Sequence, residues 1–61
     1  MLMNFYTNGV RKHIATKYIS CVPAVGTIVK FGATVYRVEN VELELDICAY
    51  EIQMRVVHKL K

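Results

Sequence analysis

The stretch TVYRVENVELELDICAYEIQMRVVHKLK, Thr34–Lys61, carries the strongest structural pattern in the chain. Apolar and polar side chains alternate on both sides of a turn at 46–49, which predicts a long antiparallel hairpin. In the first arm, the apolar positions change from even to odd numbers near Glu39-Asn40. One extra residue, a β-bulge, produces such a slip and bends the strand. We therefore expect a bent hairpin made of strands 34–45 and 49–61.

The register of this hairpin follows from folding it at 46–49. Leu45 then lies opposite Tyr50, and both arms present one apolar face, as a sheet that covers a core requires. The same register places Glu44 opposite Glu51, which is a mildly unfavourable like-charge pair that an external cation would relieve.

The preceding stretch, VPAVGTIVKFGATVYRV at 22–38, reads as turn, strand, turn and strand. Pro23 fixes φ and removes a donor, and Gly26 permits a positive φ, so 22–26 is predicted to be a turn. A short strand at 27–31 and a tight turn at Gly32-Ala33 follow. Turn chemistry and core packing account for these residues, and we interpret the stretch as scaffold.

The N-terminal third allows two interpretations. Asn8-Gly9 between β-friendly runs predicts a hairpin that places Phe5 opposite Lys12 and Met3 opposite Ile14. The apolar residues from 10 to 22 also recur every four positions, which fits an amphipathic helix that ends before Pro23. The β-branched residues of this segment favour a strand.

These segments predict one small all-β domain over residues 1–61. We expect four to five antiparallel strands with a long bent C-terminal hairpin, which form a small partly open SH3-like barrel or a curved sheet. An OB-like barrel is a further possibility, although the chain is short for it.

The spacing Pro23-Ala24-Val25-Gly26, Val29-Lys30-Phe31-Gly32 and Tyr36-Arg37-Val38 resembles that of small SH3-like barrel proteins encoded by bacteriophages and mobile elements. The resemblance covers residues 22–61. Thr27 departs from it, because an acidic residue is common at this position in those proteins. The resemblance implies a fold and a phage or mobile-element origin, and it implies no activity.

The composition narrows the class of protein. The chain is 54% hydrophobic and carries a formal net charge of +3, so it is neither disordered nor strongly basic. Such apolar content in 61 residues predicts a surface that pairs with a second copy, and hence a homodimer. There is no apolar run of transmembrane length and no secretory signal, so we expect a cytoplasmic protein, in the host cytoplasm if it is phage-encoded. Cys21 and Cys48 are then expected to be reduced, buried thiols.

The chain contains no motif that is typical of a catalytic or metal-binding site. There is no nucleophile–base arrangement, phosphate-binding loop or zinc-protease motif, and so we predict no enzyme activity and no cofactor. His13, Cys21, Cys48 and His58 are the available zinc ligands, but no two of them have the close spacing of structural zinc sites, and no metal site is expected.

Two binding functions remain. All five acidic residues lie between 39 and 51, so the hairpin is an acidic projection on a basic protein that could contact a protein partner and inhibit it. The candidate residues for this contact are Glu42, Glu44, Asp46 and Glu51. The alternative is a small nucleic-acid-binding barrel, since basic residues and the aromatic residues Tyr18 and Phe31 are interleaved in the first part of the chain. Its candidate residues are Arg11, Lys12, Lys17, Lys30 and Arg37.

Overall fold

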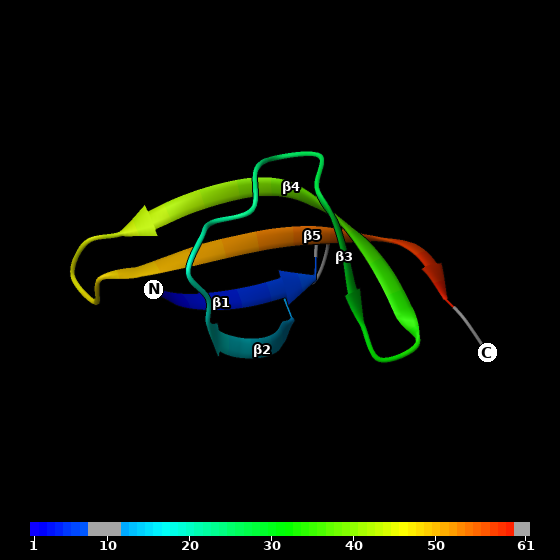
Figure 1. The fold of residues 1–61 in the computed structure, drawn as a ribbon, viewed down its shortest axis with the longest axis horizontal. Helices are drawn as coiled ribbons and strands as arrows, with labels where there is room; N and C mark the ends of the chain where they lie inside the picture. Colours follow the sequence, from blue (N-terminus) through cyan, green and yellow to red (C-terminus); the bar gives the residue numbers. More distant parts are fainter. Residues whose placement is uncertain (8–11, 60–61) are drawn as a thin grey trace.

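The computed structural model describes residues 1–7 and 12–59, which form a five-stranded sheet and no helix (Figure 1). Its strands are β1 (Leu2–Thr7), β2 (His13–Tyr18), β3 (Ile28–Phe31), β4 (Thr34–Glu44) and β5 (Ala49–Lys59). The predicted all-β fold with a long C-terminal hairpin is confirmed. A strand also forms in the segment for which a helix was the alternative.

The strand order across the sheet is β2-β1-β5-β4-β3, so β2 and β3 are its two edge strands. The pairings β1–β2, β3–β4 and β4–β5 are antiparallel as expected. β1 instead runs parallel to β5, with Met3 opposite Tyr50 and Phe5 opposite Ile52. The other three strands lie between β1 and β5 in the chain and supply the long connection that a parallel pair needs.

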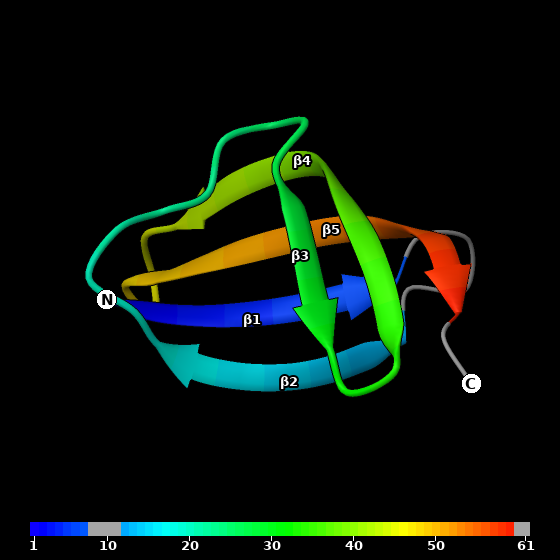
Figure 2. The same ribbon diagram turned by 45° about the vertical axis from the view of Figure 1, so that its right-hand side comes forward.

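The sheet curls because its ladder is interrupted by bulges. Val38 pairs with Met54 and Asn40 with Gln53, so Glu39 is the extra residue of the ladder and the predicted bulge is confirmed. Two further register shifts leave Ile14 in β2 and Val57 in β5 without opposite residues. Each bulge adds a local bend and twist. The result is an open half-barrel in which β3 crosses the face of the sheet (Figure 2).

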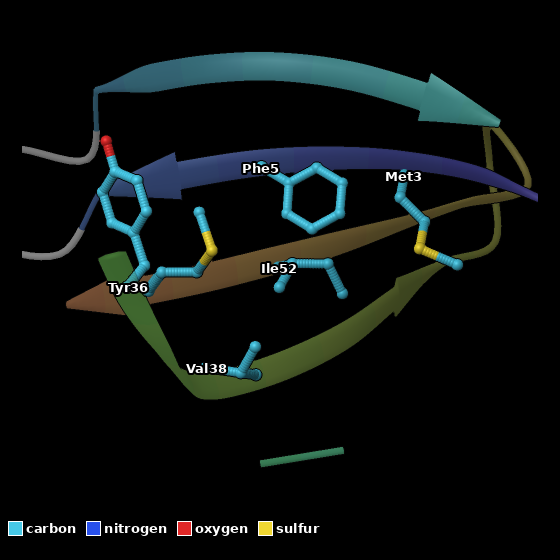
Figure 3. Packing of buried hydrophobic residues seen from close by; sticks show 6 residues of the cluster. Met3, Phe5, Tyr36, Val38 and Ile52 are labelled. Atoms are coloured by element: carbon cyan, nitrogen blue, oxygen red, sulfur yellow. The ribbon is translucent and has the colours of Figure 1, made fainter. Parts of the chain in front are cut away.

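The core lies on the inner face of this curl. Six buried side chains form it: Met3, Phe5, Tyr36, Val38, Ile52 and Met54 (Figure 3). Phe31 ties β3 to this core through edge-to-face contacts, with ring centroids 5.2 Å from Phe5 and 6.1 Å from Tyr36. Such geometry is favourable for aromatic pairs.

The predicted registers of the β4–β5 hairpin and of the β1–β2 hairpin were wrong, although their apolar faces were largely predicted. The β4–β5 turn is Leu45–Cys48, with Cys48 at a positive φ of 51°, so Tyr50 faces Leu43 instead of Leu45. This shift of two residues keeps each side chain on its predicted face.

In the first hairpin, Phe5 faces Ala15 and Met3 faces Lys17. The Thr7 N–H donates to the Lys12 carbonyl at 2.8 Å. The two-residue turn at Asn8-Gly9 that set the predicted register lies outside the described residues. Ile14 nevertheless packs against the core, as expected.

The two turns of the 22–38 stretch are confirmed. The Thr27 N–H donates to the Ala24 carbonyl at 3.1 Å, and Gly26 has a φ of 95°, as the third residue of a type II turn requires. Phe31 pairs with Thr34 across the two-residue turn Gly32-Ala33, where Gly32 has a φ of 55°. Both glycines therefore have a conformational reason to be present.

Candidate functional site

The end of the β4–β5 hairpin, Glu42–Glu51, is hereafter the hairpin tip, and it projects at one end of the molecule (Figure 1). Glu42, Glu44 and Asp46 are exposed. The apolar residues between and after them are exposed as well, with 51% of Leu43, 73% of Leu45 and 57% of Ile47 accessible to solvent. Alternation places Glu42 and Glu44 on the face of β4 opposite to Leu43, whereas Leu45, Asp46 and Ile47 belong to the turn that follows β4.

Glu51, the fourth acidic candidate, is half-buried and lies opposite Glu42 rather than Glu44. Two amides offset this like-charge pair. Asn4 Nδ2 donates to Glu51 Oε2 at 2.9 Å, and Gln53 Nε2 donates to Glu42 Oε1 at 3.5 Å. The relief that we expected from an external cation is therefore provided by the sheet itself, which gives Glu51 a structural role.

Glu51 belongs to a chain of hydrogen bonds across the outer face of the sheet, the face opposite the core. Thr16 Oγ1 donates to Asn4 Oδ1 at 2.7 Å, and His13 Nε2 lies 2.9 Å from Thr16 Oγ1. These contacts join β5, β1 and β2. Sequence reasoning missed them because they depend on the parallel pairing of β1 with β5 and on a β1–β2 register that was not predicted.

The described basic candidates are spread over different parts of the sheet. Lys12, Lys17, Lys30 and Arg37 are exposed, and Arg11 lies outside the described residues. Arg37 lies opposite Arg55, whose Nε is 3.4 Å from Glu39 Oε2. Lys17 and Lys30 line a common surface. Of the two aromatic residues proposed for stacking, Tyr18 is exposed, whereas Phe31 packs against the core.

The surface shared by these lysines is a groove of about 440 Å³ between β2, β3 and the segment that connects them. Phe5, Ile19, Pro23, Val29 and Phe31 provide its apolar walls, and Lys17 and Lys30 are its charged residues. Its lining residues come from both edge strands, from the segment between them and from Phe5 of β1. The sequence gives no local signal for this groove, because β2 and β3 are at opposite ends of the strand order.

Cys21 and Cys48 are free thiols, and both are exposed. The expectation that they are buried was wrong: Cys21 lies at the groove, and Cys48 ends the hairpin turn. Within residues 1–7 and 12–59, no three His, Cys, Asp or Glu side chains are grouped as a metal site would require. The same residues include no helix long and apolar enough to cross a membrane.

Fold and surface together define a small all-β protein with a curled, partly open sheet, an acidic and apolar hairpin tip, and an apolar groove that contains two lysines. No known protein family, curated protein or solved structure matches the chain.

Proposed function

We propose that this protein is a non-enzymatic interaction module that binds a protein partner through the hairpin tip. The observation that carries this proposal is the run of exposed apolar side chains Leu43, Leu45 and Ile47 among exposed acids. Large apolar side chains that cluster at a projecting end, surrounded by charge, are typical of contact surfaces.

The chemistry of the tip specifies the chemistry of its partner. Leu45 and Ile47 gain free energy only where they leave water, so the partner must offer an apolar depression. Glu44 and Asp46 steer the tip toward basic surfaces and disfavour acidic ones. A suitable partner surface is therefore an apolar groove with lysine or arginine at its rim.

Affinity capture tests this proposal with two variants of the full chain. Leu45→Ser/Ile47→Ser removes the apolar contact, and Glu44→Lys/Asp46→Lys reverses the charge. We expect both to lose at least about 90% of the captured partner, since contact residues of this kind each contribute more than about 1 kcal/mol. Val25→Ser, at another exposed apolar residue, is the control and should retain it. Equal capture by both tip variants and wild type contradicts the proposal.

Nucleic-acid binding is the second candidate, and the pair Lys17 and Lys30 with the exposed Tyr18 nearby in β2 is what favours it. Its test is fluorescence anisotropy with labelled single- and double-stranded DNA and RNA at low salt. Binding through these lysines should weaken steeply as salt is added. An absence of binding at low salt would exclude this function.

Phage or mobile-element origin stays a prediction of the resemblance described above, and inhibition of a host or phage protein stays a prediction from the acidic hairpin. The capture experiment bears on inhibition directly, because a captured partner can be assayed with and without the hairpin-tip variants.

A further inference from the structure

The groove between β2 and β3 has the chemistry that the hairpin tip requires. Its walls are apolar and its two ionised side chains, Lys17 and Lys30, are both positive. No acidic residue lines it among those that the structure describes. The tip presents the complement, with apolar Leu45 and Ile47 beside acidic Glu44 and Asp46.

We infer that the groove of one copy receives the hairpin tip of a second copy of this chain. This inference rests on the proposed function, because it assigns the same tip as a contact surface and adds an occupant for the groove.

Charge selects this occupant over a generic apolar segment. A neutral apolar peptide would leave Lys17 and Lys30 at the rim without counter-charges, whereas the tip brings two exposed carboxylates to them. Opposite charges across a contact set its register and speed its formation. The chain has only five acidic residues, and three of them, Glu42, Glu44 and Asp46, are exposed in the tip.

The size of the groove also suits the tip. A volume of about 440 Å³ lies in the range of depressions that hold a small ligand or a few side chains. Leu45 and Ile47 flank Asp46 in the turn, so these two apolar residues are confined to a short segment. No residue of the tip lines the groove of its own copy among the described residues.

The groove and the hairpin tip differ in chemistry, and this difference constrains how two copies of the chain assemble. If two copies exchange tips, each groove is filled and the contact closes as a two-fold dimer. Both contacts of such a dimer are identical, so one substitution in the groove or the tip changes both of them at once. This property allows a charge-exchange test.

The test uses sedimentation velocity of two full-length variants, alone and mixed. The groove variant Lys17→Glu/Lys30→Glu carries acids on both surfaces, and the tip variant Glu44→Lys/Asp46→Lys carries lysines on both. We expect wild type to form a dimer of the 7.0 kDa chain, and each variant alone to dissociate at least about tenfold more readily. An equimolar mixture should regain the wild-type dimer, since each tip then meets a groove of opposite charge.

The matched control is Lys12→Glu/Lys59→Glu, which changes the net charge by the same amount at exposed lysines outside the groove. It should dimerise like wild type. A wild type that stays monomeric at about 1 mM, a groove variant that dimerises as well as the control, or a mixture that stays monomeric would each overturn the inference. Circular dichroism establishes that each variant is folded.

The native cysteines provide a second measurement that needs no charge change. Cys21 lies at the groove and Cys48 in the tip, so a short bis-maleimide should join Cys21 of one copy to Cys48 of the other. The Cys21→Ser and Cys48→Ser variants should each lose the cross-linked dimer. A Cys48–Cys48 link in the wild type would instead show a tip-to-tip contact and overturn the inference.

The groove variant also separates this inference from the proposed function. A Lys17→Glu/Lys30→Glu chain still carries an intact tip and should capture the partner protein. If it dimerises normally while tip variants lose the partner, the inference fails and the proposed function stands. If tip variants retain the partner but lose the dimer, the proposed function fails and the inference stands.

Discussion

At the scale of single residues, backbone conformation and hydrogen bonding explain positions that composition alone does not. Cys48 is the only non-glycine residue with a positive φ among those described, and it ends the turn of the hairpin tip. A side chain in this conformation costs about 1–2 kcal/mol, because its Cβ crowds the following carbonyl oxygen. Asn4 has a different role, since it lies between a carboxylate and a hydroxyl on the outer face.

Replacing Cys48 by glycine should raise the free energy of unfolding by about 0.5–1 kcal/mol, because the relieved crowding of about 1–2 kcal/mol exceeds the additional entropic cost of ordering glycine. Urea denaturation measures this change. Cys21→Gly is the matched control and should lower stability, since Cys21 does not have a positive φ. A loss of stability in Cys48→Gly would contradict the interpretation of the turn.

Replacing Asn4 by alanine should lower the free energy of unfolding by about 1 kcal/mol, because Glu51 loses an amide donor beside the carboxylate of Glu42. The same urea experiment measures it. Asn40→Ala, at an exposed position in the bulge, should change stability by less than about 0.5 kcal/mol. Equal effects of the two substitutions would show that the outer-face hydrogen bonds contribute nothing.

At the scale of elements, patterns within a strand could be predicted and pairings between distant strands could not. Alternation predicted the long hairpin, the bulge at Glu39 and the apolar face that holds Val38 and Ile52. The predicted register was wrong at the hairpin turn, because no residue type in Leu45–Cys48 indicates that Cys48 adopts a positive φ. The parallel β1–β5 pair has no local signal, since it depends on the whole chain.

The bulge at Glu39 sets curvature rather than the apolar pattern. Without Glu39, Val38 and Val41 would still face the core, because Asn40 would follow Val38 in an uninterrupted ladder. Deleting Glu39 should therefore straighten β4, weaken the Phe5–Phe31 contact and lower the free energy of unfolding by at least about 2 kcal/mol.

Glu39→Ala is the control for this deletion. It keeps the bulge and removes side-chain interactions such as the half-exposed ion pair with Arg55, so it should cost less than about 1 kcal/mol. Hydrogen exchange should show faster exchange in β3 for the deletion alone. A deletion that is as stable as Glu39→Ala would contradict the role of the bulge in closing the half-barrel.

At the scale of the whole molecule, a small core is accompanied by many exposed apolar side chains. Six residues form the core cluster, while Leu45, Ile47 and several other large apolar side chains remain accessible. The apolar content of the sequence predicted such a surface. Its location could not be predicted, because the groove combines residues of β1, β2, β3 and the segment between β2 and β3. The acidic tip, by contrast, is one continuous segment, and its exposure followed from the hairpin.

Self-association should make thermal stability depend on concentration. If the folded dimer is stabilised by mass action, the unfolding midpoint should rise by several degrees over a hundredfold increase in protein concentration. Differential scanning calorimetry measures it, and the groove variant Lys17→Glu/Lys30→Glu should lose the dependence. A constant midpoint in the wild type would argue against a dimer that is coupled to folding.

The central claim is that the hairpin tip is the contact surface of this protein. The most direct test is a dilution series of the ¹⁵N-labelled wild type followed by NMR. We predict that amide signals of residues 43–48 in the tip and of the groove segments 17–21 and 29–31 shift together as concentration falls, while Asn4 and Thr16 on the outer face stay constant. Tip signals that do not change across a dilution in which other signals shift would contradict the claim.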